Sequence, residues 1–213
     1  MPLPMVHLST ALLLEEEGIV RPAERSAYYL GSIAPDAIHM REHPASDAKS
    51  LSHAGARSPR FLDRIDSFCQ RFPDYERSGI SRDYLMGYLV HLLTDIYWKQ
   101  AFYDGFVQRY REDPAPLQNE KAAYYNDTDV ADIRLYKTLP RRPELWALLQ
   151  AAHGYDLPGM VSAEEVDRWN ARTLAWYEVP REYLPVRYAS EESIRSFIRT
   201  AAERIREYLG EVH

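Results

Sequence analysis

Apolar residues recur at spacings of three and four along most of the chain, whereas strict alternation of apolar and polar residues is scarce. This periodicity gathers apolar side chains on one face of a helix, so it predicts an all-α fold. We expect a single-domain bundle of about 8–10 helices over residues 1–213. The predicted helices cover residues 5–17, 22–31, 60–72, 81–105, 118–139, 143–153, 162–177 and 190–210.

The segment 81–105 carries the strongest helical pattern. Its centre, residues 85–98, is apolar nearly all round, so we expect this helix to be the buried axis of the bundle. Ser81 stands where a side chain can cap the first turn of this helix. In a later helix, Ser162 followed by Glu165 predicts a capping box.

Two stretches interrupt the helical pattern. Residues 35–59 are polar and rich in proline, and we expect a long loop there, of the kind that is usually functional or disordered. Within it, Pro35 is expected to hold the backbone extended and to aim Asp36 inward. A turn is expected at residues 73–79.

The composition narrows the classes of function. Of the 213 residues 46% are hydrophobic, which is enough for one core. With 26 basic and 32 acidic residues the net charge is -6, so we expect no binding to duplex nucleic acid. A single cysteine, Cys69, excludes a disulfide framework and a thiolate zinc finger. No membrane span of ~20 apolar residues and no secretory signal pattern are present, so the expected location is the cytoplasm.

His91 and Asp95 lie four residues apart in the middle of the apolar helix. At that spacing the imidazole and the carboxylate share one face, about 5–6 Å apart, and a metal ion can bridge them. A buried charge is costly unless it is paired or coordinates a metal. The alternative is a hydrogen bond between the two side chains that only orients the core.

Three more residues offer ligand atoms: His7, Asp36 and His53. Each by itself is more typical of a structural histidine or of an aspartate in a turn or helix cap. Together with His91 and Asp95 they form a set of nitrogen and oxygen ligands without sulfur. Such a set suits one or two divalent metal ions, with zinc as the first expectation and iron, manganese or nickel as alternatives.

Four ordered segments lie in roughly the first half of the chain. They read Val-His-Leu at 6–8, Leu-Gly-Ser-Ile-Ala-Pro-Asp at 30–36, Ser-His at 52–53 and Gly-Tyr-Leu-Val-His-Leu-Leu-Thr-Asp-Ile-Tyr-Trp at 87–98. In this order they resemble the zinc-dependent phospholipase C family, which is related to single-strand nucleases, and in particular its short cytoplasmic members. The resemblance implies an all-α fold and hydrolysis of a phosphodiester or phosphomonoester. The metal ligands that it implies are His7, Asp36, His53, His91 and Asp95.

The chain departs from the secreted members of that family. Those proteins use an N-terminal tryptophan and a further cluster of histidines and an acidic residue to build a site for three zinc ions. Here the chain begins Met1-Pro2, and no His-x-x-x-Asp or His-x-x-x-Glu follows Asp95. We therefore expect neither a three-zinc site nor phospholipase activity, but hydrolysis of a small phosphorylated substrate.

Within this hypothesis Asp36 and Asp95 are the catalytic carboxylates, because either could bridge two ions and hold the attacking oxygen. His39 is a third catalytic candidate, since it follows Asp36 by three residues and would face the same way on a helix. Arg41 and Lys49 are basic residues close in sequence to the predicted ligands Asp36 and His53, and their charges would suit a substrate phosphate.

Asp129 and Asp132 are further candidate ligands, three residues apart on one predicted helix face. HD-type nucleotide phosphohydrolases have similar ligand chemistry and can take an acidic ligand from a later helix, although their adjacent His-Asp pair is missing here. The alternative for both aspartates is an acidic helix start favoured by the macrodipole. Two other classes of protein stay open: a non-catalytic metal-binding or regulatory module, and a metal-free helical interaction protein.

Overall fold

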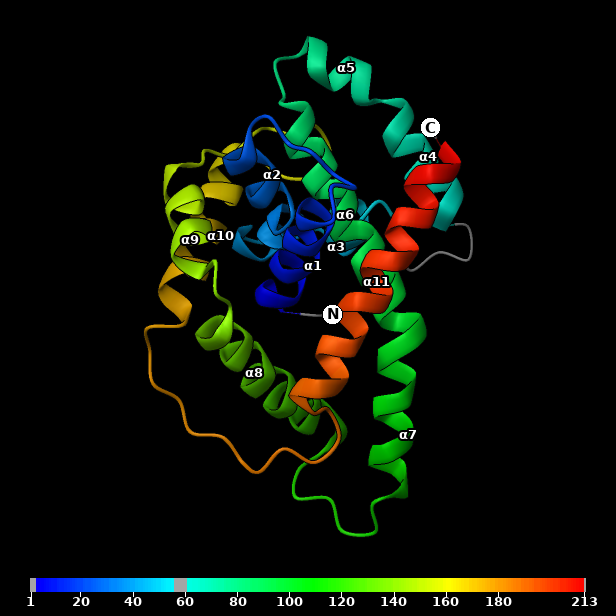
Figure 1. Ribbon diagram of the computed structural model, residues 1–213, viewed down its shortest axis with the longest axis vertical. Helices are drawn as coiled ribbons and strands as arrows, with labels where there is room; N and C mark the ends of the chain where they lie inside the picture. Colours follow the sequence, from blue (N-terminus) through cyan, green and yellow to red (C-terminus); the bar gives the residue numbers. More distant parts are fainter. Residues whose placement is uncertain (1–2, 56–60, 213) are drawn as a thin grey trace.

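The computed structural model describes residues 3–55 and 61–212, and within them the chain is built from helices (Figure 1). The first half contains α1 (Pro4–Glu16), α2 (Arg25–Gly31), the 3₁₀-helix η1 (Ala34–Met40), α3 (Ala48–Ser52), α4 (Phe61–Gln70), α5 (Phe72–Arg77) and α6 (Arg82–Trp98). The second half contains the π-helix η2 (Lys99–Tyr103), α7 (Asp104–Glu112), α8 (Glu120–Thr138), α9 (Arg142–Ala151), α10 (Ala163–Trp176) and α11 (Glu191–Val212). The all-α prediction is confirmed: in these ranges the one β feature is an isolated bridge between Leu157 and Val161.

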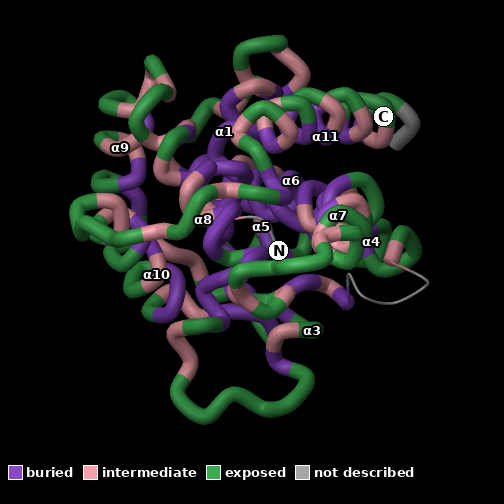
Figure 2. Tube along the Cα trace, turned by 90° about the horizontal axis from the view of Figure 1, so that it is seen from below, coloured by how far each residue is buried: buried purple, intermediate pink, exposed green. Residues whose placement is uncertain are grey.

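Helix α6 is the buried axis of the bundle, as its apolar pattern predicts. It packs against α1, α2 and α11, and Figure 2 shows it buried among the surrounding helices. The helical rod does not end near residue 105 as expected, because η2 continues it into α7 as far as Glu112. Ser81 occupies the N-cap position of α6, but its side chain makes no capping hydrogen bond.

Two glycines let α2 and α6 lie in direct backbone contact. A Cβ atom at Gly87 would lie 2.0 Å from the carbonyl oxygen of Tyr28, and one at Gly31 would lie 2.2 Å from that of Tyr84. Both distances are far shorter than van der Waals contact, so glycine alone fits at these positions. The chain that follows α2 is thereby held beside the middle of α6.

The predicted loop and the predicted turn are both partly helical. The stretch 35–59 contains η1 and α3. Pro35 stands in the first turn of η1, where its missing N–H costs no hydrogen bond, so the backbone there is helical rather than extended. The turn expected at 73–79 is helical over α5, with Pro73 in its first turn. Residues 56–60, and with them the predicted helix start at position 60, lie outside the described residues.

The capping box predicted for α10 is present. Ser162 Oγ accepts a hydrogen bond from the backbone N–H of Glu165 at 3.2 Å, and Glu165 Oε2 accepts one from the N–H of Ser162 at 2.9 Å. Two of the unpaired N–H groups at the helix start are therefore satisfied by side chains.

We expect Ser162→Ala to lower the free energy of unfolding by about 1 kcal/mol, because it removes this cap. Urea denaturation followed by circular dichroism measures the change. Ser67→Ala is the control, since Ser67 is exposed and its Oγ donates to the carbonyl oxygen of Asp63 in the same helix, α4, at 2.7 Å. A loss of stability in Ser67→Ala as large as in Ser162→Ala would contradict the capping role.

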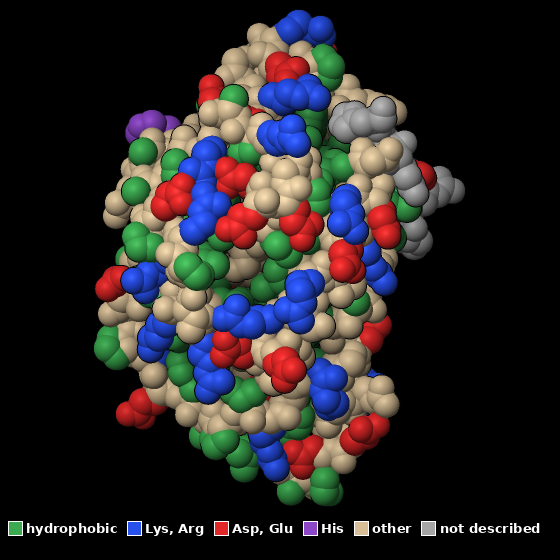
Figure 3. Space-filling view, in the orientation of Figure 1, with side chains coloured by type: hydrophobic (Ala, Val, Ile, Leu, Met, Phe, Trp, Pro, Cys, Tyr) green, Lys and Arg blue, Asp and Glu red, His purple; other side chains and the backbone are tan. Residues whose placement is uncertain are grey.

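Basic and acidic side chains are interspersed over the face shown in Figure 3. That face offers no broad basic surface of the kind that binds a polyanion non-specifically. In the described part of the chain, no helix combines the length and the apolar character needed to cross a membrane.

Candidate metal centre

The five predicted ligands, which come from four elements, meet in one cluster. His7 lies on α1, Asp36 on η1, His53 at the end of α3, and His91 and Asp95 on α6. Ligand atoms of Asp36, His53 and His91 lie within 4.8 Å of one another. The same holds for His7, His91 and Asp95. His53 connects the two groups, because its Nε2 is 3.4 Å from Asp36 Oδ1 and 3.5 Å from Asp95 Oδ2.

Most of the ligand atoms in this cluster are buried without a hydrogen-bond partner. Within the described residues, these atoms are His7 Nδ1 and Nε2, Asp36 Oδ1, His53 Nε2, His91 Nε2 and Asp95 Oδ1. Buried polar atoms in folded proteins are nearly always paired, and each unpaired one costs about 1–3 kcal/mol. Metal ions would engage one nitrogen of each imidazole and the carboxylate oxygens, so the donor set fits metal binding.

Hydrogen bonds to the backbone orient two of the imidazole rings. His91 Nδ1 lies 2.9 Å from the carbonyl oxygen of Ser32, and His53 Nδ1 lies 3.1 Å from that of Lys49. A carbonyl oxygen can only accept. The Ser52 hydroxyl, 2.8 Å from His53 Nδ1, donates to the Lys49 carbonyl oxygen at 3.1 Å, so we assign the proton to Nδ1 in both rings. The lone pair of each Nε2 then faces the cluster, which is the arrangement found in histidines that bind metal.

His7 and His91 stack face to face, with ring centroids 3.7 Å apart and 4° between the ring planes. Burial lowers the pKa of both rings, and the neighbouring His91 lowers the pKa of His7 further. Both rings are therefore neutral near pH 7, the form that binds metal. Burial alone would raise the pKa of Asp36, but His53 and His91 outweigh it, and the pKa lies below its usual range. Asp36 thus contributes a carboxylate.

A cavity of about 630 Å³ reaches the cluster at His53 and Asp95. Its walls come from α3, the end of α6, η2 and the first turns of α8. The side chains of His53 and Asp95 are only 6% and 8% exposed, so the cavity is the route by which a small molecule meets them. The cavity therefore adds a place for a ligand next to the place for an ion.

His39 and Lys49 lie at the edge of the cluster, whereas Arg41 is engaged elsewhere. His39 Nε2 is 3.7 Å from Asp36 Oδ1 and 3.1 Å from Lys49 Nζ, so His39 faces the same way as Asp36. Lys49 also lines the cavity. Arg41 donates from Nε and Nη2 to the two carboxylate oxygens of Glu165, at 2.6 and 2.9 Å. This ion pair holds the end of η1 against α10, and we leave Arg41 out of the proposed site.

Asp129 and Asp132 lie on α8, and neither belongs to the two ligand groups found among the described residues. Asp132 Oδ1 accepts a hydrogen bond from the N–H of Met5 at 3.0 Å, and its Oδ2 accepts one from the Tyr177 hydroxyl at 2.5 Å. Asp129 Oδ2 lies 3.5 Å from the Tyr183 hydroxyl. These contacts give both aspartates a structural explanation, since they tie α1 and the chain after α10 to α8.

Asp132 is expected to make the stability of the fold depend on pH. Burial raises the pKa of Asp132 from its usual 3.8 to about 7. Between these values the folded chain keeps a proton that the unfolded chain has released, so stability falls as the pH rises from about 4 to about 7. The slope from this one carboxyl is at most ~1.4 kcal/mol per pH unit.

We expect Asp132→Asn to lose this slope, because asparagine keeps the acceptor for the Met5 N–H but does not ionise. Urea denaturation of both proteins at several pH values between about 4 and 8 measures the difference in unfolding free energy. Groups far from Asp132 contribute equally in both proteins, so their contribution cancels in the difference. A difference that is independent of pH would show that the Asp132 carboxyl is not the source.

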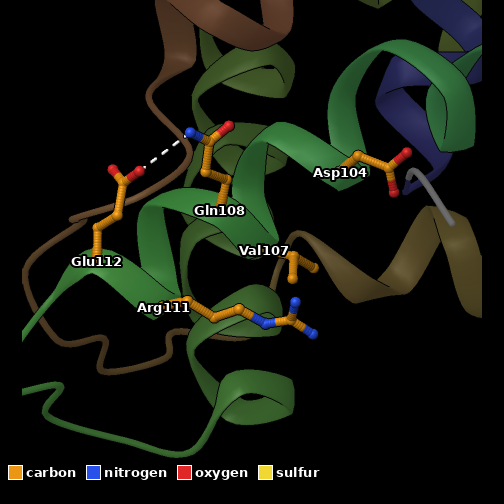
Figure 4. A pocket seen from close by; sticks show the side chains of 5 residues that line it. All are labelled: Asp104, Val107, Gln108, Arg111 and Glu112. Atoms are coloured by element: carbon orange, nitrogen blue, oxygen red, sulfur yellow. Dashed lines mark hydrogen bonds between the residues drawn. The ribbon is translucent and has the colours of Figure 1, made fainter.

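A second hollow lies on α7 (Figure 4). It is lined by Asp104, Val107, Gln108, Arg111 and Glu112. All of these residues belong to one helix, and Gln108 Nε2 donates to Glu112 Oε1 at 3.0 Å. The hollow contains none of the candidate metal ligands, so it is separate from the candidate metal centre.

The sequence reasoning missed three residues at the site. Lys99 and Lys121 line the cavity, and the carbonyl of Ser32 orients His91. Lys99 follows Asp95 by four residues, so helical periodicity alone could have placed it on the same face. No local pattern connects Ser32 or Lys121 with α6, because both come from other elements.

A scan against models of known protein families, a search of curated proteins and a search of solved structures each returned no match to this chain. The fold and the cluster themselves define its class: an all-α protein with buried groups of histidine and aspartate that could hold a metal ion. The resemblance to the zinc-dependent phospholipase C family therefore rests on the sequence segments alone.

Proposed function

We propose that this chain is a metal-dependent phosphoesterase related to the short members of the zinc-dependent phospholipase C family. The observation that carries the proposal is the set of unpaired ligand atoms from three histidines and two aspartates beside a cavity. A site that served packing alone would be at least as stable with apolar residues of similar volume. The polar cluster is better explained by an ion and a ligand.

The geometry supports sites for two ions that share one carboxylate. The Nε2 atom of His91 has a single lone pair, so it binds one ion at a time. We assign it to a first ion together with Asp36 Oδ1, His53 Nε2 and Asp95 Oδ2. His7 and the other oxygen of Asp95, 3.7 Å from His7 Nε2, would hold a second ion. Zinc suits this nitrogen and oxygen set best, and iron, manganese or nickel would also fit.

A divalent ion held there would supply a water of lowered pKa and would withdraw charge from a phosphoryl oxygen. Hydrolysis adds the oxygen of water to phosphorus, breaks the P–O ester bond and delivers a proton to the leaving alcohol. The chain's own part is to orient and to move protons. Asp36 and Asp95 would position the attacking water through the ions that they hold. His39 would relay protons to solvent, since it lies 3.7 Å from Asp36 and its side chain is 41% exposed.

The test starts from protein purified without an affinity tag. Metal content is measured by plasma mass spectrometry. Turnover is then measured with p-nitrophenyl phosphate, bis-p-nitrophenyl phosphate, cyclic nucleotides and phosphocholine, each with zinc, manganese and iron(II). We expect one or two bound ions and hydrolysis that is lost with chelator and restored by metal.

Two results would overturn the proposal. Bound metal without turnover on any phosphoester, and with unfolding on chelation, would identify a structural or regulatory metal module. Protein without metal, and with a melting temperature unchanged by added zinc, manganese or iron(II), would identify a metal-free helical protein whose polar core is a hydrogen-bond network.

A further inference from the structure

Lysine is rare in this chain, and it is concentrated in one place. Lysine and arginine together number 26, but the sequence contains only four lysines: Lys49, Lys99, Lys121 and Lys137. The first three all line the cavity that reaches the candidate metal centre. The basic residues elsewhere are almost all arginines. The cavity therefore differs from the rest of the chain because its positive charges are lysines and because three of them lie together.

The three lysines come from separate elements. Lys49 lies on α3, Lys99 begins the π-helix η2, and Lys121 lies in the first turn of α8. A π-helix inside a longer α-helix is uncommon and occurs often at functional sites. Here it carries Lys99 at its start and Tyr103 at its end, and both line the cavity. Because the three lysines come from three elements, their proximity is not explained by the sequence of one exposed helix face.

The lysines make the cavity positive although the whole chain is negative. Among the lining residues, three ammonium groups face two carboxylates, those of Glu120 and Asp95. Asp95 belongs to the candidate metal centre, where a bound ion would neutralise it. Within residues 3–55 and 61–212, no carboxylate forms an ion pair with Lys99 or Lys121. Lysine is a compact, mobile point charge, a form that suits phosphate groups.

Aromatic rings form another part of the lining. Trp98 Nε1 donates to the Tyr124 hydroxyl at 2.8 Å, and the Tyr103 hydroxyl lies 3.5 Å from Glu120 Oε1. Trp98 is only 1% exposed, so it forms a wall behind the lining. The hydroxyl of half-buried Tyr103 is occupied by the protein, and its ring surface is what it offers to a ligand. Tyr125, which is 48% exposed, adds a further ring at the cavity.

We propose that this lysine cavity binds a second phosphate group of the substrate. The substrate is then a small molecule with at least two phosphates, one of which reaches the metal centre while the other lies among the lysines. Its organic part packs against the aromatic rings. The statement about the reacting phosphate rests on the proposed function, whereas the binding of the second phosphate needs no turnover.

The experiment compares two pairs of probes that differ by one phosphate: adenosine diphosphate with adenosine monophosphate, and fructose 1,6-bisphosphate with fructose 6-phosphate. Calorimetry measures their dissociation constants for the protein as purified and after treatment with chelator. We expect the compound with two phosphates to bind at least about tenfold more tightly in one or both pairs. The pair with the larger ratio of dissociation constants indicates whether the preferred ligand is a nucleotide or a sugar phosphate.

The double variant Lys99→Gln/Lys121→Gln is expected to lose this preference, while the control Lys137→Gln keeps it. Lys137 is exposed at the far end of α8, so it matches the change in charge without touching the cavity. Each of the single variants Lys99→Gln and Lys121→Gln should lose part of the preference. These variants test the inference if the double variant does not fold. A preference that survives in the double variant, or that is absent from the parent protein, overturns the inference.

Metal content measured on the same samples separates this inference from the proposed function. Protein that neither holds metal nor responds to added zinc, manganese or iron(II), but distinguishes the probes through Lys99 and Lys121, leaves the inference intact and overturns the phosphoesterase proposal. Protein that holds metal and hydrolyses phosphoesters, but binds both members of each pair equally, overturns the inference alone.

Discussion

His91→Ala is expected to remove bound metal and to lower phosphoesterase turnover by at least about 100-fold, since even the loss of a residue that only orients a metal ligand costs 10–100-fold. His91 belongs to both ligand groups, and Nε2 is its unpaired ring nitrogen. Alanine also leaves the carbonyl oxygen of Ser32 without the N–H that lies 2.9 Å away, so the fold loses some stability. Plasma mass spectrometry and turnover of p-nitrophenyl phosphate measure the two effects.

His153→Ala provides the matched control, because His153 is exposed and outside both ligand groups. It should retain wild-type metal content and turnover. His7→Ala is expected to lower the metal content only by the second ion. Circular dichroism establishes that each variant is folded. If folded His91→Ala kept the full metal stoichiometry, the proposed site would be wrong.

Gly87→Ala is expected to destabilise the fold by at least about 3 kcal/mol. The added Cβ would meet the carbonyl oxygen of Tyr28 at 2.0 Å and the backbone nitrogen of Ser32 at 2.9 Å. Both neighbours are backbone atoms, which cannot rotate away, so α2 must separate from α6. The same movement shifts Ser32 relative to His91 and should weaken metal binding. Urea denaturation and metal analysis measure both effects.

Gly210→Ala is the control for this substitution. A Cβ at Gly210 would meet no atom within 4 Å, and the residue lies in α11. Alanine costs less conformational entropy than glycine in a helix, so this variant should be more stable by roughly 0.5–1 kcal/mol. Equal effects of Gly87→Ala and Gly210→Ala would contradict the close approach of α2 and α6.

Parts of the site that depend on one helix could be predicted from the sequence. The apolar pattern of 85–98 indicated a buried axis, and α6 is one. The spacing of His91 and Asp95 predicted that they share one face of the helix. In the structure their ligand atoms and one of His7 lie within 4.8 Å of one another. Helical periodicity is a property of the local backbone, so residues three and four apart are related in space whatever packs around them.

Parts that depend on packing were predicted less well. Pro35 suggested extended backbone, but the chain there forms η1, which packs against α10 and α6. Local preferences amount to about 1 kcal/mol per residue or less, and burial against neighbouring helices outweighs them. The π-helix η2 has no signal in the apolar pattern either, because the rod of α6 and α7 stays helical through it.

The sequence by itself determined the helical class, the buried position of α6 and the chemical types of the candidate ligands, because these depend on composition and on spacing within one helix. Only the tertiary structure decided that His7, Asp36 and His53 meet His91 and Asp95, which ring nitrogens are left unpaired, and that three of the four lysines line one cavity. The reason is that distances between separate elements follow from how helices pack. Here that packing depends on glycines that let α2 touch α6 and on buried contacts that no local pattern records.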